Sequence, residues 1–148
     1  MPELVILAEF QMKSAGPKYR PVNRTRGEIE AETTQCVLSV LKEVIGRGPD
    51  DAQTHLCDTL LAVRLHFPLH PMEKAMLQAN EPKGLTAVRN WRRDLYEACR
   101  NKLVAAVSAV TQVPIRTLYV DSSPADEESM LVFTLESPLD LRVSPEKS

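Results

Sequence analysis

Histidine and cysteine, the side chains that most often bind transition metals, occur close together in the middle of the sequence. His55, Cys57, His66 and His70 are the candidates, and if the segments holding the first three pair as strands, alternation puts those three on one face. The same pairing places His66 opposite Asp51, roughly 13 Å along the strand from His55. Because the ligands of one ion must converge, we predict exposed polar side chains and an ordinary thiol here, with no metal site and no cofactor.

No catalytic motif accompanies these side chains. The sequence has no glycine-rich phosphate loop, no G-x-S-x-G turn and no H-E-x-x-H helix, and it contains only 5 glycines. The acidic pair Asp50-Asp51 falls where a turn is expected, and carboxylates are common at turns for solvation and capping. A small-molecule enzyme using His55, His66 and Asp51 is therefore the class we favour least.

Arginines are concentrated in a later segment that has a helical pattern. Arg89, Arg93 and Arg100 share a helix face, and between residues 85 and 102 five basic residues stand against two acidic ones. Glu97 lies four residues after Arg93 and can pair with it. The segment is either a ridge for an anionic partner or a solvated, salt-bridged helix face, and we favour the latter.

Composition indicates an ordinary soluble domain. The chain has 148 residues, 43% of them hydrophobic, and a net charge of -2, which argues against a surface designed throughout for nucleic-acid phosphates. Its three cysteines, Cys36, Cys57 and Cys99, lie in apolar or regular segments, as buried reduced thiols do, and we expect a reducing cytoplasm. No apolar run approaches the roughly 18 residues that a membrane span needs.

Three regions differ in composition. Residues 1–27 have a charge of +3 and glycine and proline breaks, which predicts a flexible basic extension. Residues 28–136 carry the regular patterns of a single α+β domain, and residues 137–148 read as a frayed acidic tail. Nucleic-acid binding through the basic extension and the arginines of the later helix is the alternative function that this charge pattern leaves open.

Helix signals are strongest just after the basic extension. Thr25 and Glu28 have the spacing of a capping box, and apolar residues recur every three or four positions from Ile29 to residue 45, where Gly46 and Pro49 end the pattern. A short helix is expected over residues 72–79 and a long one over residues 85–111. The inner stripe of the long helix should contain Val88, Trp91 or Arg92, Leu95, Cys99, Leu103, Ala106, Val107 and Val110, with Trp91 in the core.

Strand signals follow each long helix. Residues 52–57 and 60–67 form a predicted hairpin with Cys57 opposite Leu60 and His55 opposite Ala62, and residues 115–121 and 130–136 form a second pair. A helix plus β-hairpin used twice gives the order α-β-β-α-α-β-β. The predicted α+β architecture is a four-stranded, mainly antiparallel sheet with two long helices on one face, and the strand order stays open.

Several segments occur in the order found in a known family. These segments are Gly46-Arg47-Gly48-Pro49, Leu61-Ala62-Val63-Arg64-Leu65, Leu69-His70-Pro71-Met72-Glu73-Lys74, Arg92-Arg93-Asp94-Leu95 and Leu131-Val132-Phe133-Thr134-Leu135-Glu136. Through them the sequence resembles the MpsC-like family, long described as a domain of unknown function and named for a sodium-translocating, membrane-potential-generating system.

The resemblance implies a bacterial cytoplasmic accessory protein, at the inner face of the membrane, associated with a cation- or bicarbonate-handling system. It implies no catalytic residues. We therefore expect a non-enzymatic accessory or regulatory module that binds a protein partner, such as a membrane complex, and that forms a homodimer. The candidate contact residues are charged groups of the family-like segments that burial does not explain: Arg64, Glu73, Lys74, Arg89, Arg93 and Asp94.

Overall fold

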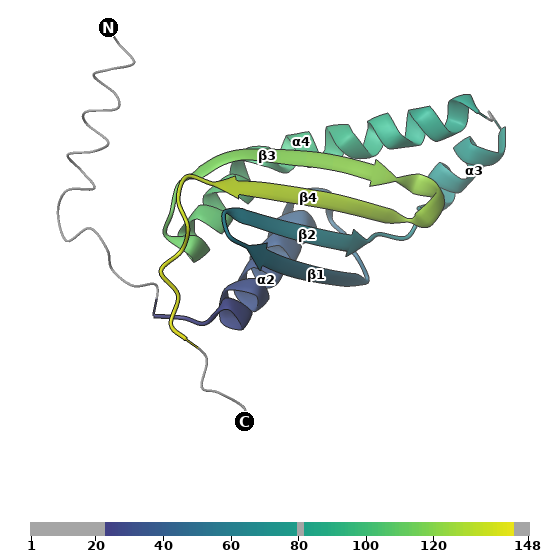
Figure 1. Ribbon diagram of the computed structural model, residues 1–148. Helices are drawn as coiled ribbons and strands as arrows, with labels where there is room; N and C mark the ends of the chain where they lie inside the picture. The colour runs from purple at the N-terminus through teal and green to yellow at the C-terminus, as the bar shows by residue number, and fades with distance from the viewer. Residues whose placement is uncertain (1–22, 80–81, 144–148) are drawn as a thin grey trace, which may run out of the picture.

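The computed structural model describes residues 23–79 and 82–143, and its elements follow the predicted order (Figure 1). Most of the predicted basic extension, residues 1–22, lies outside the described residues. In chain order the elements are α2 (Arg26–Ile45), β1 (Asp51–Cys57), β2 (Leu60–His66), α3 (Pro71–Ala79), α4 (Lys83–Thr111), β3 (Ile115–Ser123), the 3-10 turn η1 (Pro124–Asp126) and β4 (Glu128–Leu135).

Helix α2 begins and ends where its local signals place it. The Thr25 side chain accepts a hydrogen bond from the Glu28 N–H, and the Glu28 side chain accepts one from the Thr25 N–H, so the predicted capping box is formed. Gly46 adopts a left-handed conformation with φ of 88°, which only glycine takes at little cost. The apolar stripe, including Val37 and Leu41, is buried.

The first hairpin has the predicted register. Cys57 pairs with Leu60 and His55 with Ala62, and Asp58 supplies the tight turn by taking a positive φ of 55°. Alternation buries Leu56 against the core and sends its neighbour Cys57 to the exposed face. The expectation that all three thiols are buried is therefore wrong for Cys57.

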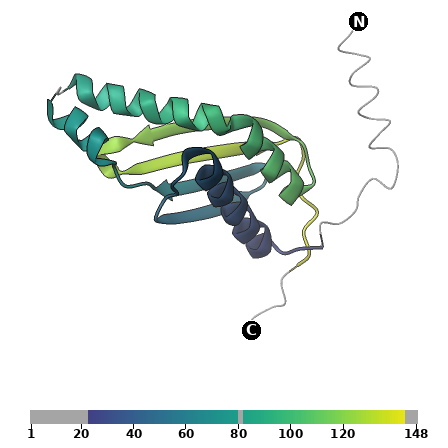
Figure 2. The same cartoon turned by 180° about the vertical axis from the view of Figure 1, so that it is seen from behind.

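The four described strands form one antiparallel sheet in the order β1-β2-β4-β3, so the two hairpins join through β2 and β4. These central strands supply the most deeply buried apolar side chains of the sheet, among them Val63, Leu131 and Phe133. Helices α2 and α4 cover one face of the sheet, as the reverse view makes clear (Figure 2). The predicted α+β class and architecture are confirmed.

Helix α4 buries most of the predicted stripe, but with Tyr96 and Thr111 in place of Leu95, Ala106 and Val110. Arg92 and Tyr96 are buried, whereas Trp91 is 50% exposed, so the expectation of a core tryptophan is wrong. Positions 91 and 92 lie about 100° apart on a helix, and the buried stripe passes through 92 because Arg92 finds a carboxylate inside the protein. The buried residues of α4 are Gly84, Val88, Arg92, Tyr96, Cys99, Leu103, Val107 and Thr111.

The described part of the C-terminal tail, residues 137–143, runs back beside the start of α2 (Figure 1). Leu139 and Leu141 pack against the core, and the Arg142 guanidinium contacts Glu28 at 3.0 Å. The sequence predicts fraying over residues 137–148, whereas residues 139–142 contact the rest of the fold. Residues 144–148 lie outside the described part of the chain. No helix within the described residues is long and apolar enough to cross a bilayer.

Candidate functional site

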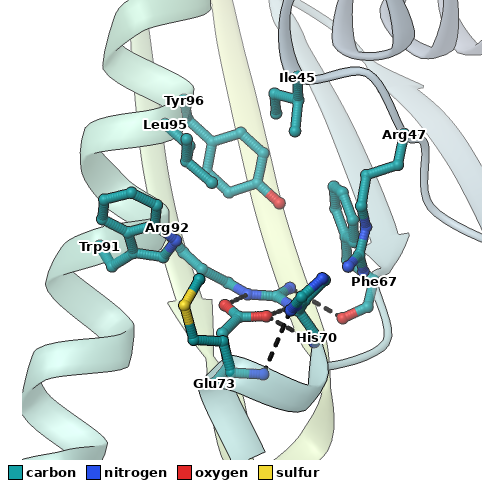
Figure 3. Close-up of a pocket in the computed structure, with 10 residues that line it drawn as sticks. Ile45, Arg47, Phe67, His70, Glu73, Trp91, Arg92, Leu95 and Tyr96 are labelled. Atoms are coloured by element: carbon teal, nitrogen blue, oxygen red, sulfur yellow. Dashed lines mark hydrogen bonds and ion pairs between the residues drawn. The ribbon is translucent and has the colours of Figure 1, made fainter. Parts of the chain in front are cut away.

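A pocket of about 220 Å³ opens between α3, α4 and the loops that follow α2 and β2 (Figure 3). Most of its wall is apolar. Trp91 and Met72, which are 50% and 63% exposed, lie at its mouth. The apolar residues that line the pocket are Ile45, Phe67, Met72, Trp91, Leu95 and the ring of Tyr96.

A buried ion pair lies on one side of this pocket. The Arg92 guanidinium donates two hydrogen bonds to the Glu73 carboxylate, at 2.8 and 2.9 Å, and the two side chains are only 4% and 8% exposed. Such a two-point contact fixes both groups in orientation. Glu73 also accepts a hydrogen bond from the His70 N–H at 2.8 Å, while the His70 ring accepts one from the Met72 N–H, so both residues cap α3.

Opposing influences act on the Glu73 carboxyl. Burial alone raises its pKa, but hydrogen bonds from Arg92 and from the His70 N–H, together with the charges of Arg92 and Arg47, lower the pKa overall. Glu73 is therefore a carboxylate at neutral pH, with its charge compensated by Arg92.

The Phe67 ring ties the pocket to the neighbouring loop. The guanidinium carbons of Arg92 and Arg47 each lie 4.8 Å from the ring centroid, within the range of a cation–π contact. Arg92 also donates to the carbonyl oxygens of Phe67 and Pro68, at 2.8 and 3.0 Å, and Arg47 donates to the Pro68 oxygen at 2.5 Å. These contacts hold the loop after β2 against α4.

The Tyr96 hydroxyl differs from the polar groups of Glu73, Arg92 and Arg47, which all have hydrogen-bond partners. Tyr96 is 1% exposed and its hydroxyl has no hydrogen-bond partner within the described residues. Burial raises the pKa of Tyr96, and the Ser129 side chain, itself hydrogen-bonded to Ser122 at 2.9 Å, acts in the opposite direction. The Tyr96 hydroxyl oxygen is fully buried, so it is the ring of Tyr96 that lines the pocket (Figure 3).

The arrangement suits binding better than catalysis. Glu73 and Arg92 hold each other, and a general acid or base must be free to exchange a proton with a substrate. With that pair neutralised, Arg47 gives the pocket a net positive charge beside an apolar wall. The residues present therefore offer a cation beside an apolar cavity.

The structure buries one of the six predicted contact residues and exposes the other five. Glu73 is buried in the pocket, so the premise that burial does not explain it is wrong: its partner is Arg92, 19 residues along the chain. The other five lie exposed on the sheet, α3 and α4: Arg64, Lys74, Arg89, Arg93 and Asp94. Their role in partner contact stays a prediction.

All three exposed arginines among these residues have intramolecular partners, and that of Arg64 is Glu128 at 2.8 Å. Arg89 makes a two-point contact with Asp121 on β3, at 2.7 and 3.0 Å, and Arg93 lies 3.7 Å from the same carboxylate. Glu97 pairs with Arg100 and not with Arg93 as expected, because Asp121 attracts Arg93 toward the sheet. This is the salt-bridged helix face that we favoured, and it lowers the charge available to nucleic acid.

The histidines do not gather around one point. His55 lies exposed on β1, His66 pairs with Asp50 at 2.6 Å, which raises the His66 pKa, and His70 caps α3. Within residues 23–79 and 82–143, no group of three or more histidine, cysteine, aspartate or glutamate side chains has a geometry that could hold a metal ion.

Sequence reasoning missed Arg47, Phe67 and Tyr96 as site residues, and it did not connect Arg92 with Glu73. An arginine at a stripe position, with a glutamate in the first turn of the preceding helix, was the available signal. No local pattern connects Phe67 or Arg47 to that pair, because their contacts join separate loops.

Comparisons with known proteins give a family match over most of the chain. Residues 25–137 match the family described as Na+-translocating membrane potential-generating system (MpsC). Among curated proteins the chain is similar to the uncharacterized protein YbcI of Bacillus subtilis (strain 168), at 24% identity over 119 residues, which cover 80% of this chain and 94% of the relative. No solved structure matches the chain. The matched range includes every described helix and strand.

Proposed function

The chain belongs to the MpsC family, and from that premise we propose that it is a non-enzymatic accessory or regulatory protein of a membrane cation- or bicarbonate-handling system. It acts in the cytoplasm, at the inner face of the membrane, by binding a protein subunit of that system. The family description supports an association with a membrane system, and the exposed Trp91 and Met72 at the pocket mouth support a contact surface there.

The exposed tryptophan carries this proposal. Trp91 projects at the mouth of the pocket with Met72 beside it, and large exposed aromatic and methionine side chains are typical of the centres of protein interfaces. Asp94 follows Trp91 by about one helical turn and Lys74 follows Glu73 on α3, so charged side chains accompany the apolar ones. This combination of an apolar centre and a charged rim supports docking on a protein.

A pull-down from membranes tests the contact. The tagged full chain is added to detergent-solubilised membranes of the source organism, and retained cation-antiporter subunits are identified by mass spectrometry. We expect Trp91→Glu to lose these subunits, because a charge at the centre of the contact must be desolvated on binding. The matched control is Leu85→Glu, which puts the same charge at an exposed apolar position of the same helix.

Deleting the gene tests the biological part of the proposal. We expect the deletion strain to grow poorly at high sodium concentration or at low bicarbonate, and the wild-type gene to restore growth where the Trp91→Glu gene does not. Unchanged growth in all these media, or retention of the antiporter subunits by the Trp91→Glu protein, would contradict the proposal.

A further inference from the structure

The face of the sheet that points away from α2 and α4 is not covered by any described element (Figure 1). Alternation places on it the even-numbered residues of β2 and β4 and the odd-numbered residues of β3 from Thr117 on. Two of its large apolar side chains are well exposed, Tyr119 at 62% and Leu60 at 44%. Exposed apolar side chains make this face a candidate contact surface.

The edges of the sheet are less open to a partner than this face. On the edge strand β1 the Leu56 N–H donates to the Glu30 carboxylate at 2.8 Å, and on the edge strand β3 the Leu118 oxygen accepts from the Arg100 guanidinium at 2.8 Å. Side chains thus occupy backbone groups that an added strand would need. Contact through the face is therefore favoured over extension of the sheet.

The strand register makes this face complementary to itself. Strand β4 lies between β2 and β3, at roughly 4.8 Å from each, so Val132 of β4 has Ala62 on one side and Tyr119 on the other. A two-fold axis along β4 at Val132 places Tyr119 of each copy over Ala62 of the other, because both neighbours lie at the same distance from the axis. An exposed ring then meets a small side chain, twice.

Charged side chains follow the same symmetry two residues along β4. Met130 lies between Arg64 and Asp121, which are both exposed, and the same axis brings Arg64 of each copy to Asp121 of the other. Glu128 of the two copies also approach each other at the start of β4, where each is neutralised by the Arg64 of its own chain. Opposite charges at symmetric positions favour a second copy as the occupant of this face.

From these features we infer that two copies of the chain pack their uncovered sheet faces together about a two-fold axis that runs along β4. The strands of the two sheets then run in nearly the same direction, which is the aligned packing of two facing sheets. Helices α2 and α4 form the outer layers of the dimer. None of the residues placed in this contact lines the Trp91 pocket, so the inference does not rest on the proposed function.

Charge reversal tests the assigned contact between the copies. The wild type, Arg64→Glu and Asp121→Lys are compared by size-exclusion chromatography with light scattering over a series of concentrations. We expect the wild type to be a dimer. We expect the dissociation constant of each single variant to rise at least tenfold, because its homodimer brings like charges together twice.

An equimolar mixture of the two variants is then examined by native mass spectrometry, which separates the heterodimer from both homodimers by mass. In the heterodimer both contacts regain opposite charges, so we expect it to form in preference to either homodimer. This restoration distinguishes the contact from an effect on folding, since a destabilised chain would not be rescued by a second destabilised chain.

Arg26→Glu and Asp94→Lys are the matched controls, because they reverse charges at exposed positions of α2 and α4. Each should remain a homodimer, and their mixture should show no preference for the heterodimer. The inference is overturned if the wild type is monomeric throughout the series, if Arg64→Glu and Asp121→Lys dimerise like the wild type, or if their mixture forms no more heterodimer than the control mixture.

Discussion

At the residue scale, the Glu73–Arg92 pair shows how a charge can occupy a core position. Arg92 takes a place on the buried stripe of α4 because Glu73 and two backbone carbonyls accept its hydrogen bonds. Burying either charge alone would cost several kcal/mol, so each residue is tolerated only in the presence of the other. The pair also joins α3 to α4.

Glu73→Gln should therefore lower the free energy of unfolding by about 3–5 kcal/mol, because it leaves the Arg92 charge buried without a counter-charge. Urea denaturation followed by circular dichroism measures the change. The control Glu128→Gln makes the same substitution in the exposed Arg64–Glu128 pair and should cost at most about 1 kcal/mol.

Replacing both members of the buried pair by methionine should be less destabilising than Glu73→Gln, since no buried charge is then left. Equal effects of Glu73→Gln and Glu128→Gln would refute the structural role that we assign to the pair.

The Asp121 carboxylate on β3 predicts a pH dependence. The hydrogen bond from Arg89, followed by that from the Ser122 N–H, lowers the pKa of Asp121 from 3.8 to about 2. A lowered carboxyl pKa adds stability that is present above the unfolded-state pKa and is lost as pH falls through the folded-state pKa. The contribution of Asp121 should therefore be lost between about pH 4 and pH 2.

Asp121→Asn should be less stable than the wild type at neutral pH, with a difference that narrows as the pH falls over that interval. Arg89→Gln should behave in the same way, and the double variant should add little to either single one, because the two residues share one contact. Urea midpoints at a series of pH values measure this, and a difference independent of pH would contradict it.

At the element scale, α3 and α4 approach each other closely at a glycine. A Cβ added at Gly84 would lie 2.2 Å from the Met76 carbonyl oxygen, a backbone atom that cannot move aside. The close approach lets α3 pack on α4 and so brings Glu73 to Arg92.

Gly84→Ala should accordingly destabilise the protein by about 1–3 kcal/mol, despite the higher helix propensity of alanine, because the added methyl group overpacks the contact. Gly27→Ala is the matched control: Gly27 is also helical, nothing lies within 4 Å of its added Cβ, and stability should rise by up to about 1 kcal/mol. Thermal unfolding compares the two, and a Gly84→Ala protein as stable as Gly27→Ala would exclude the steric argument.

At the scale of the whole molecule, the sheet has one covered and one uncovered face. Helices α2 and α4 cover the inner face, and no described element covers the other (Figure 1). On the outer face Tyr119, which is 62% exposed, lies in one row with Val132 and Ala62, next to exposed Leu60. Apolar residues gathered in this way favour contact with another protein surface.

This face is where we expect a second copy of the chain to bind in the predicted homodimer. Tyr119→Arg should convert the dimer into a monomer, because a charged side chain would be desolvated in the apolar row. Size-exclusion chromatography with light scattering measures the mass, and Leu85→Arg, at an exposed position on α4, should leave the dimer intact. A wild-type monomer, or a Tyr119→Arg dimer, would disprove this arrangement.

Local features of the fold could be read directly from the residues. The capping box at Thr25, the hairpin register that pairs Cys57 with Leu60, and the helix and strand order depend on neighbours a few positions apart, so periodicity and turn chemistry were enough. Arg64, Arg89 and Arg93 were correctly expected to be exposed for the same reason.

Only the tertiary structure decided the strand order, the site and which of Trp91 and Arg92 faces inward. Two positions that differ by about 100° on a helix are both compatible with one apolar stripe, and the choice depends on the buried carboxylate of Glu73, which belongs to another helix. The pocket is determined in the same way, because Arg47, Phe67 and Tyr96 meet through contacts between distant segments that no repeat in the sequence encodes.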